Sequence, residues 1–556
     1  MDAHARRVSS ILHSGDQYVI PQFQRYYVWE EKDWNRLWDD ILDLLDDEDP
    51  KPEHFFGSIV CAPLDHTPGR VPAYLVIDGQ QRAVTTIILL CAIRDRANEL
   101  GAQKISGDIQ ENYLTHKYKE GLERYKVILR LRDRQTLLHL IDQKQPDTEN
   151  RITDAYKFFL DKVRDYAKDE VRLNNVFVAT VDKLSIVMIT LREENPFSIF
   201  ETLNATGQKL KEADMIRNYV FMKVPFADQD KFDYEEWQPF ENLFPGSDTY
   251  PAIPYDNFYR HFLMRNGNYI RPNEIYIKFK EETEKAKTSA RELLSTLKQQ
   301  ADHYVLFNRP EMAKQDKLRS ELRRLSKLDI STCYPLLLNL FDLSRNGMLS
   351  QDDLAEMLRW IQSFHIRRLV VGGTTRPYSR WFPTIIRELQ QSDIKASLIK
   401  SLEKRGWPND EEFISSLTKF QIYYSGIAFV VLSSLEESYG YKEPVDPSKL
   451  QIEHVMPETI EDDEDGNDWK TMLGSQWQEI HTTYLHTLGN LTLTGYNPEL
   501  SNACYSKKQQ LYADSRLELN KHFAHTSKWN ESEIRQRGEK LAKDATLIWY
   551  RPIFQS

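Results

Sequence analysis

One stretch of the chain constrains the fold more than any other: AYLVIDGQQRAVTTIILLCAI, residues 73–93. It starts as an apolar run of strand character and becomes, from Ala83 to Ile93, a run that is apolar almost all round a helix. Such a helix has no polar face to turn towards water, so it must be buried. The sequence therefore predicts a strand and a core helix joined by one short polar turn.

The turn between them consists of Asp78, Gly79, Gln80, Gln81 and Arg82. The first turn of a helix presents unpaired N–H groups and the positive end of the helix dipole, and an arginine adds a planar fork of donors. These features predict an anion site. A well-capped turn without a ligand explains the same residues, and short motifs often match by chance. The local pattern leaves both interpretations open.

A Walker-type phosphate loop does not compete with this turn. That loop has the sequence GxxxxGK[ST], and none of the 21 glycines of the chain is followed directly by lysine. The chain is therefore excluded from the Walker-type ATPases. If it handles nucleotides, the DGQQR turn is the leading candidate for the phosphate site.

A length of 556 residues predicts several domains, because one core rarely serves so long a chain. The expected domains are an α+β N-terminal domain over residues 1–223, an α-helical connector over residues 224–405 and a C-terminal domain over residues 406–556. The expected strands of the first domain are residues 55–62, 73–77 and 184–191. One helix of this domain should bury an apolar stripe that consists of Trp34, Leu37, Trp38, Ile41 and Leu45.

Composition limits the partners and the compartment. The net charge of −11 argues against a protein that coats nucleic acid nonspecifically, so DNA binding needs local basic residues. The four cysteines stand apart without a CxxC pair, which fits a reducing cytoplasm. The N-terminus lacks the apolar core of a signal peptide, and no run approaches the roughly 18 apolar residues of a membrane span. We expect a cytoplasmic protein without a membrane partner.

A basic segment of the helical middle has two interpretations. Arg367, Arg368, Arg376 and Arg380 surround a Gly-Gly break in SFHIRRLVVGGTTRPYSRWF. They could contact phosphates, or they could form an ion-pair cluster at a joint between domains. The structural interpretation is favoured.

The strongest chemical constellation lies near the C-terminus. Glu453 and His454 follow a short apolar segment, and Asn490 lies in LGNLTL. The polar residues after them are, in order, Asn497, Asn502, Lys507 and Lys508. Metal-assisted phosphodiester hydrolysis needs a base of near-neutral pKa, which histidine supplies, and a hard cation held by oxygen ligands.

Each residue of this constellation has a place in such chemistry. A carboxylate beside the histidine and an amide oxygen near the following helix can bind the cation, and Asn490 can hold the loop that aims the imidazole. Lys507 and Lys508 can contact the flanking phosphates. Taken singly, each residue has a duller role, such as a turn-forming asparagine or a core histidine. Together, in this order, they favour a phosphodiesterase.

Four ordered motifs resemble the N-terminal domain of the GmrSD family of modification-dependent restriction systems. They are IPQFQRYYVW (20–29), FGSIV (56–60), DGQQRAVTT (78–86) and FETLNATGQKLKEADMIRN (200–218). The segments IEHVMPE and LGNLTLTGYNPELSNACYSKK and the closing tryptophan-bearing helix resemble the family's partner domain, an HNH nuclease. The helical middle carries few diagnostic residues.

The resemblance implies an α+β, multidomain fold. It comprises a ParB/sulfiredoxin-like nucleotide-hydrolysing domain, an α-helical middle, and a C-terminal ββα-metal (HNH) nuclease domain in a helical setting. The implied nucleotide site is formed by Asp78 to Arg82, with Gln24, Arg25 and Tyr27 of the first motif facing them. Ala83 and Val84 stand where the family often has Leu-Thr, and both suit a buried helix.

In the nuclease domain, the resemblance makes Glu453 a ligand of Mg²⁺ or Mn²⁺, His454 the general base and Asn490 the residue that orients it. The third HNH position is often histidine, and here it is asparagine. Asn497 is favoured for it because it stands just before a helix, and Asn502 is the alternative, so both are candidate metal ligands.

The family implies a type IV-like restriction endonuclease. A nucleoside triphosphate, GTP or ATP, at the first domain would control cleavage of modified double-stranded phage DNA by the last, and a homodimer is compatible with this function. One alternative is a nucleotide-responsive sensor or binding subunit that does not cut, against which the intact Glu453, His454 and Asn490 argue. Another is an abortive-infection nuclease that attacks the host's own nucleic acid.

Overall fold

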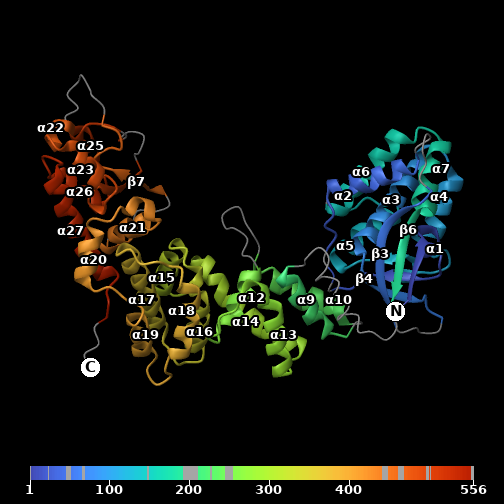
Figure 1. The fold of residues 1–556 in the computed structure, drawn as a ribbon, viewed down its shortest axis with the longest axis horizontal. Coiled ribbons are helices and arrows are strands. Elements are labelled where there is room, and N and C mark those ends of the chain that lie inside the picture. Colours follow the sequence, from blue (N-terminus) through green and yellow to red (C-terminus); the bar gives the residue numbers. More distant parts are fainter. Residues whose placement is uncertain are drawn as a thin grey trace. The chain divides into compact units, whose positions relative to one another are not determined.

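The computed structural model describes residues 2–22, 24, 26–45, 52–64, 69–146, 150–191, 211–225, 228–244, 255–440, 449–460, 469–495, 500 and 502–552. The chain divides into two compact units: Met1–Asn242 with Phe279–Ser295, and Leu243–Lys278 with Thr296–Ser556. Figure 1 shows helices around a sheet in the first unit and mainly helices in the second. The multidomain α+β class expected from the sequence is confirmed.

A six-stranded mixed sheet runs through the first unit in the order β1-β6-β3-β4-β2-β5. Its strands are β1 (Asp2–Arg7), β2 (Gln17–Val19), β3 (His54–Pro63), β4 (Ala73–Asp78), β5 (Val127–Ile128) and β6 (Leu184–Thr190). Strand β3 pairs parallel with β6 and antiparallel with β4, and β4 pairs parallel with β2. The three strands predicted from the sequence are confirmed to within one residue at each end.

Helices and short helical turns complete the first unit. They are α1 (Val8–Leu12), α2 (Glu31–Asp43), α3 (Gln80–Glu99), α4 (Gln103–Asp108), η1 (Ile109–Leu114), η2 (Gly121–Arg124), α5 (Leu131–Ile141), α6 (Arg151–Tyr166), α7 (Glu170–Val178), η3 (Ala179–Lys183), α9 (Glu212–Met222), α10 (Gln229–Phe232), η5 (Asp233–Trp237) and α11 (Gln238–Glu241). The predicted stripe of α2 is buried at Trp34, Leu37, Trp38 and Ile41, whereas Leu45 follows the helix and is half-buried.

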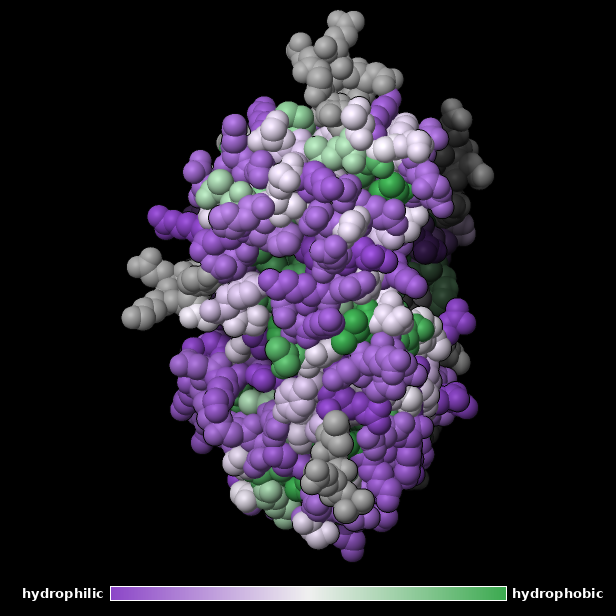
Figure 2. Space-filling model, turned by 90° about the vertical axis from the view of Figure 1, so that its left-hand side faces the viewer, coloured by the Kyte–Doolittle hydropathy of each residue, from purple (hydrophilic) through white to green (hydrophobic). Residues whose placement is uncertain are grey.

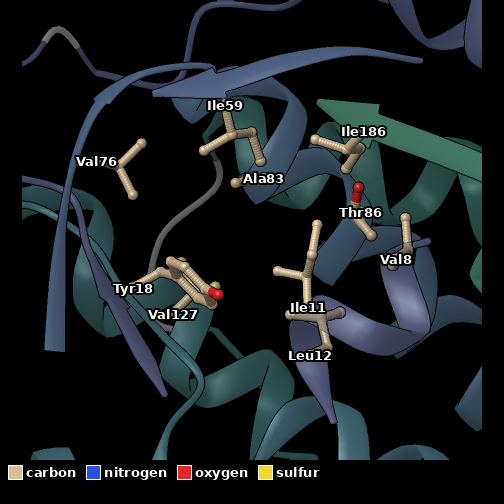
Figure 3. Close-up of a pocket in the computed structure, with 10 residues that line it drawn as sticks. All are labelled: Val8, Ile11, Leu12, Tyr18, Ile59, Val76, Ala83, Thr86, Val127 and Ile186. Carbon is tan, nitrogen blue, oxygen red and sulfur yellow. The ribbon is translucent and has the colours of Figure 1, made fainter. Parts of the chain in front are cut away.

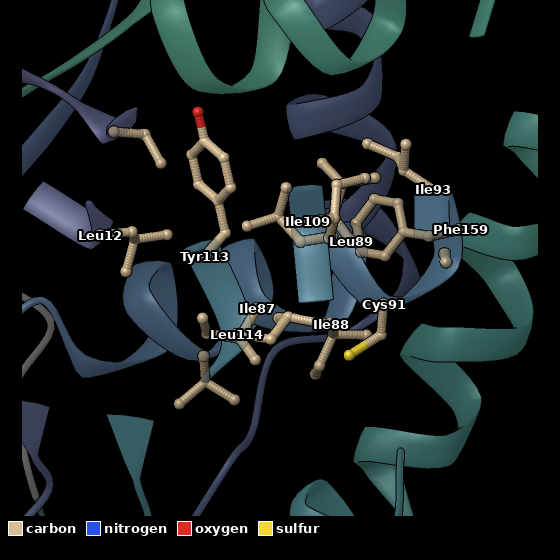
Figure 4. Packing of buried hydrophobic residues seen from close by; sticks show 14 of the residues in the cluster. Leu12, Ile87, Ile88, Leu89, Cys91, Ile93, Ile109, Tyr113, Leu114 and Phe159 are labelled. Carbon is tan, nitrogen blue, oxygen red and sulfur yellow. The ribbon is translucent and has the colours of Figure 1, made fainter. Parts of the chain in front are cut away.

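Helix α3 lies at the centre of this unit's core, as its all-round apolar sequence predicted. Every residue from Val84 to Ile93 is buried. Figure 4 shows Ile88, Leu89 and Ile93 of α3 packed among side chains of η1 and α6, including Tyr113 and Phe159. The helix therefore fixes the position of the DGQQR turn, which forms its N-terminus.

A small apolar cavity lies between α1, α3 and the sheet (Figure 3). Its volume is about 30 Å³, and Val8, Ile11, Ile59 and Val76 are among the residues that line it. Ligand pockets for small molecules measure roughly 300–1,000 Å³. This cavity is therefore a packing gap in the core and does not hold a nucleotide.

The second unit is built largely from helices. Two of its helices, α13 and α14, also contain residues of the first unit. In its first half the elements are α12 (Tyr255–Met264), η6 (Pro272–Glu274), α13 (Ile275–Ala286), α14 (Ala290–Asn308), η7 (Pro310–Met312), α15 (Asp316–Lys327), η8 (Ser331–Cys333), α16 (Tyr334–Arg345), α17 (Gln351–Val370), α18 (Tyr378–Glu388) and α19 (Ile394–Glu403).

A two-stranded antiparallel sheet, formed by β7 and β8, is embedded in the C-terminal part of the second unit. The elements from residue 410 onwards are α20 (Asp410–Leu417), η9 (Ile422–Ser425), α21 (Ala428–Ser438), β7 (Gln451–His454), α22 (Trp469–Leu473), α23 (Trp477–Tyr484), η11 (Leu488–Asn490), β8 (Leu491–Thr494), α25 (Tyr505–Ala513), α26 (Glu518–Ala524) and α27 (Glu531–Ile548). In chain order, the two strands precede α25.

Two arginines of the basic segment are structural. The Arg367 guanidinium is fully buried, donates to the carbonyl oxygens of Trp549 and Pro408, and pairs with Asp410 at 2.6 Å. Arg368 donates to the carbonyl oxygen of Arg405 at 2.6 Å. Both therefore hold parts of the second unit together, as the favoured interpretation of the sequence predicted.

One face of the molecule shows how hydrophilic and hydrophobic side chains are distributed on its surface. Figure 2 shows a largely hydrophilic face on which hydrophobic side chains form small separate groups. Among the described helices, none combines the length and the apolarity that crossing a membrane requires.

Candidate functional site

His454 stands at the end of strand β7, where its imidazole meets two other polar groups. Its Nε2 lies 3.1 Å from Nδ1 of His486. Its Nδ1 lies 3.6 Å from a carboxylate oxygen of Glu458. The His454 side chain is 9% exposed and the Glu458 side chain 58%, so the carboxylate lies on the solvent side of the imidazole.

Two tyrosines of η9 enclose the histidine pair. The Tyr424 hydroxyl lies 2.9 Å from Nε2 of His486. The Tyr423 ring packs edge-on against His454 with 4.5 Å between ring centroids, and it stacks on His486 at 5.4 Å. These contacts leave the imidazoles little freedom to rotate.

Burial sets the protonation of both histidines. Burial, followed by the nearby His486, Lys508 and His481, lowers the pKa of His454 from 6.5 to about 3. Burial also lowers the pKa of His486. Because a neutral imidazole carries a nitrogen lone pair, His454 is ready at neutral pH to accept a proton or to bind a cation.

Asn490 ties the end of β7 to the rest of the domain and is completely buried. Its Oδ1 accepts from the Met456 backbone N–H at 2.8 Å and from the Trp529 indole at 3.1 Å. Its Nδ2 donates to the carbonyl oxygens of Met456 and Leu485. The amide therefore fixes the chain immediately after His454, which is the position that an orienting residue needs.

Glu453 points to the other side of β7 from His454, because side chains alternate along a strand. Its carboxylate accepts from Lys508 Nζ at 2.7 Å, and the same ammonium donates to the His454 carbonyl oxygen at 2.8 Å. The Lys508 side chain is 0% exposed. This geometry differs from the expectation that Glu453 binds the metal and Lys508 binds DNA phosphate, since the two charges satisfy each other below the surface.

The other predicted nuclease residues are less constrained. Lys507 is exposed on α25 and is free of the burial that removes Lys508 from the surface. Asn502 is half-buried shortly before α25. Asn497 lies outside the described residues, so the choice between the two asparagines stays a prediction.

Within the described part of the chain, one group of side chains has the geometry of a metal site: His454, Glu458 and His486. One ligand atom from each lies within 4.8 Å of the others. The sequence reasoning missed Glu458 and His486, although both stood near recognised residues. Glu458 lies at position i+4 from His454 in EHVMPE, and His486 precedes Asn490 in HTLGN.

The predicted nucleotide site lies in the first unit, where β4 passes into α3. Gly79 caps the helix in the left-handed conformation, with φ 86°. A Cβ at this position would lie 2.6 Å from the Ser58 carbonyl oxygen. Glycine is therefore required for the DGQQR turn to lie so close to β3.

Arg82 connects two of the sequence motifs. Its guanidinium donates to the Ser58 carbonyl oxygen at 2.6 Å and lies 3.5 Å from Asp78. It covers Gly57, where a Cβ would come within 3.1 Å of the arginine side chain. Its Nε is buried and has no hydrogen-bond partner among the described residues. The guanidinium thus keeps one unpaired N–H in the interior, while about a quarter of the Arg82 side chain (26%) stays exposed.

The first motif packs directly on this turn. Gln81 accepts from the Val28 backbone N–H and donates to the Tyr26 carbonyl oxygen. Gln24 donates to the Ile77 carbonyl oxygen at 2.6 Å, and the Tyr27 hydroxyl meets Thr85 at 2.8 Å.

The residues of the predicted nucleotide site fall into two groups: buried residues that support the turn, and more exposed residues that solvent can reach. Gln24, Tyr27, Gln80 and Gln81 are all buried. The more accessible groups of the predicted site are Asp78 and Arg82, whose side chains are 46% and 26% exposed. Arg25 lies outside the described residues, as does the fourth motif as far as residue 210.

Two further arginines hold the same loop, and sequence reasoning missed them. Arg130 and Arg217 donate to the carbonyl oxygens of Gln24 and Gln22, and Arg217 also pairs with Asp233 at 2.7 Å. Nε and Nη2 of Arg130 are buried without a hydrogen-bond partner among the described residues. Arg217 belongs to the fourth motif, which was a signal for it, whereas nothing in the sequence singled out Arg130.

Comparison with known families decides the relationship. The N-terminal domain of the GmrSD restriction endonuclease matches residues 8–221. The C-terminal domain of the GmrSD restriction endonucleases matches residues 407–544. The chain belongs to the GmrSD family. No curated protein matches it.

GmrSD membership identifies the chain as a restriction endonuclease, whose substrate is DNA. The DGQQR turn falls within the first matched region, and the His454 cluster falls within the second. The matched regions end and begin close to the domain limits expected at residues 223 and 405, which stay predictions. A GmrSD chain is thus recognised at both ends, whereas its helical middle is matched by neither domain.

Proposed function

We propose that this GmrSD protein cuts modified foreign DNA, such as phage DNA, in a divalent-metal-dependent reaction that a nucleoside triphosphate controls. The observation that carries the nuclease part is the neutral His454 at the end of β7, held beside an exposed carboxylate. Family membership supports the substrate class. The nucleotide part rests on the DGQQR turn.

In this proposal His454 takes the proton from the attacking water. Asn490 holds the backbone after His454, and Tyr423 packs on the imidazole, so the base is positioned before DNA binds. The low pKa of the free imidazole weakens it as a base, and a phosphodiester brought beside it raises that pKa. Lys507 lies on the exposed side of α25, where it can contact a neighbouring phosphate.

The divalent ion, Mg²⁺ or Mn²⁺, would stabilise the negative charge that develops on the phosphate and the leaving oxygen. Glu453 does not fit as its ligand while Lys508 occupies the carboxylate. Glu458 fits better, because its carboxylate is exposed and lies beside His454. One carboxylate together with waters and substrate phosphate is a usual ligand set for Mg²⁺. Asn497 and Asn502 remain candidates for a further ligand.

For the nucleotide, GTP or ATP, we propose that the phosphates bind at Asp78 to Arg82. The α3 N-terminus offers backbone N–H groups, and Arg82 retains an unpaired Nε–H. The buried Gln24, Tyr27, Gln80 and Gln81 hold the turn and the first motif together. Binding at this turn would shift the first motif, which provides a route for control of cleavage.

The test compares cleavage of modified and unmodified phage DNA, with Mg²⁺ and with or without each nucleotide. His454→Ala should lower the rate by about a hundredfold or more, the usual loss for a missing general base. The exposed His525→Ala is its matched control. Arg82→Ala should abolish the response to nucleotide and weaken nucleotide binding measured by calorimetry, whereas Arg70→Ala should do neither.

The outcomes separate the alternatives. A His454→Ala enzyme that cuts at the normal rate sinks the nuclease assignment. Binding of DNA without metal-dependent cleavage by the wild-type protein favours a sensor subunit. Degradation of host DNA or RNA, with toxicity in the absence of phage, favours an abortive-infection nuclease.

A further inference from the structure

We propose that His454, His486 and Glu458 form a binding site for a transition-metal ion of the Zn²⁺ type, which competes with the Mg²⁺ or Mn²⁺ ion of the cleavage reaction for Glu458. We further infer that an ion bound there stops DNA cleavage, because it occupies the base. The second statement rests on the proposed function, whereas the first is independent of it.

The spacing of the three side chains fits tetrahedral coordination. Zn²⁺ binds histidine nitrogens at about 2.0–2.1 Å, so two nitrogens on one tetrahedral ion lie roughly 3.3 Å apart. His454 Nε2 and His486 Nδ1 are 3.1 Å apart. A carboxylate oxygen of Glu458 lies 3.6 Å from His454 Nδ1, and one ligand atom of each of the three residues lies within 4.8 Å of the others. Small side-chain adjustments would bring all three onto one ion.

The donor atoms select the class of metal. Two imidazole nitrogens and one carboxylate oxygen suit Zn²⁺, Co²⁺, Ni²⁺ and Cu²⁺, whereas Mg²⁺ prefers oxygen ligands and retains its waters. The set of two histidines and one glutamate leaves the fourth position open to water. The site therefore distinguishes between metals by the chemistry of its ligands.

Tyr424 supplies a support that metal-binding histidines usually have. A ligand histidine commonly donates its second ring N–H to a fixed acceptor, which orients the ring. The Tyr424 hydroxyl lies 2.9 Å from His486 Nε2 and can serve as that acceptor. When an ion binds Nδ1 of a neutral His486, the ring proton is on Nε2, where the tyrosine oxygen can accept it.

The local charges permit a cation to bind. Lys508 is a buried positive charge that acts on His454, and Glu453 pairs with it at 2.7 Å. Among the described residues the ion-pair partner of Glu458 is His454, and the Glu458 side chain is 58% exposed. An ion can therefore reach the histidines from the side of Glu458.

Metal binding and proton abstraction exclude each other at His454. The nitrogen lone pair that binds Zn²⁺ is the lone pair that would accept the proton of water. Zn²⁺ at this site should therefore inhibit cleavage that Mg²⁺ supports, with a concentration dependence that follows occupancy of the site.

The binding test uses Co²⁺ as the probe, since a tetrahedral Co²⁺ site absorbs visible light strongly. Titration of the full-length protein should give this absorption with a stoichiometry of one, and excess Zn²⁺ should remove it. His486→Ala and Glu458→Gln should weaken binding by tenfold or more, whereas His525→Ala should not change it. The site does not exist if wild type gives no tetrahedral spectrum, or if His486→Ala gives the same one.

Tyr424→Phe gives a milder test of the metal site, because the Tyr424 side chain is exposed and its replacement should not disturb the fold. It removes only the hydroxyl and should weaken Co²⁺ binding by about 10–100-fold, as loss of a ligand's supporting partner does. In the cleavage assay, the Zn²⁺ concentration for half inhibition should rise by the same factor, measured against the variant's own rate in Mg²⁺. Equal inhibition of wild type and Tyr424→Phe overturns the inhibitory role.

The two proposals fail separately. If wild type does not cut DNA in Mg²⁺, the proposed function fails, and the Co²⁺ titration still decides whether the metal site exists. If Mg²⁺ supports cleavage and Co²⁺ does not bind, the metal site fails alone.

Discussion

At the scale of single residues, His454 shows how its surroundings decide what a side chain can do. Its neighbours include positive or polar groups on several elements, namely His486, Lys508 and His481, and these add to burial in lowering its pKa to about 3. The Glu458 carboxylate faces it from the exposed side. A negatively charged phosphodiester would favour the imidazolium and raise the pKa of His454 in the DNA complex.

We therefore expect kcat/KM and kcat to depend on pH in different ways. Protonation of His454 removes the base, so activity falls as pH falls through its pKa. Because kcat/KM reports the free enzyme, it should show no acidic limb near the ordinary histidine pKa of about 6.5, whereas kcat should fall at a higher pH than kcat/KM does. Steady-state cleavage measured across the acidic range checks this, and an acidic limb near pH 6.5 in kcat/KM contradicts it.

Replacement of Asn490 should cost stability as well as activity. Its amide makes hydrogen bonds to Met456, Leu485 and Trp529 inside the core. Asn490→Ala leaves these groups without partners, and each buried unpaired group costs about 1–3 kcal/mol. We expect a clearly lower Tm of the second unit in calorimetry, together with slower cleavage. The exposed Asn268→Ala should leave Tm unchanged, and an equal Tm for both variants would count against the role of Asn490.

Sequence reasoning worked best at this scale where a residue's role is local. It selected His454 and Asn490, and the structure places both at one end of β7. It did not foresee that Lys508 fills the space beside Glu453, because that pairing depends on how α25 packs on β7. His486 and Glu458 were passed over for the same reason, since only the folded chain brings them to one point.

At the scale of elements, the turn between β4 and α3 depends on how closely it can approach the neighbouring strand β3. Gly79 lies against Ser58 and Ile59 of β3, and Gly57 lies under Arg82. The two glycines therefore determine the distance between the FGS and DGQQR motifs. Their role is steric: a methyl group at Gly79 would meet backbone atoms of β3, and one at Gly57 would press on the Arg82 side chain.

Gly79→Ala should disrupt this turn. The substitution combines a positive φ with a Cβ only 2.6 Å from a backbone oxygen, and such strain costs roughly 1–3 kcal/mol or more. We expect a lower Tm of the first unit and loss of the nucleotide response. Gly15→Ala is the matched control, since nothing lies within 4 Å of its Cβ position. Equal thermal stability of the two variants would show that the turn adapts.

The extents of the main elements followed from the sequence, whereas their arrangement did not. Apolar runs and the spacing of apolar residues in the sequence located β3, β4, β6 and the buried helix α3. In the sheet, β6 lies between β1 and β3, although it is far from both strands in the sequence. Such pairings depend on long-range packing, which a local pattern does not encode.

At the scale of the whole molecule, the second unit joins the helical middle to the nuclease end. Arg367 of α17 makes this join by bonding to the carbonyl oxygens of Pro408 and Trp549 and to Asp410. The sequence predicts a boundary between these regions at residue 405, after a mainly helical segment and before the C-terminal motifs. Contacts between helices, which composition does not reveal, place them in one compact unit.

We expect Arg367→Leu to weaken this joint. The variant leaves the Pro408 carbonyl oxygen without the Arg367 donor and removes one of the two donors to the Trp549 carbonyl oxygen, the other being the Ser363 hydroxyl, at a cost of about 1–3 kcal/mol. Calorimetry should show a lower Tm for the second unit, and limited proteolysis should cut near residue 405. Arg376→Leu, exposed in the same segment, should change stability by no more than about 0.5 kcal/mol. A normal Tm for Arg367→Leu would mean that other contacts carry the joint.

The last helix, α27, also holds the segment around Asn490 in place. Arg537 of α27 donates to the carbonyl oxygens of Gly489 and Leu491, each at 2.7 Å, and the backbone at Ile534 lies so close to Gly489 that no Cβ fits between them. A nonsense or frameshift mutation after Asn490 and before residue 531 would thus produce a protein that still contains His454, His486 and Asn490 but lacks the helix that holds their segment in place. In a genome, such an allele would look like an intact nuclease by its motifs and would behave as a null.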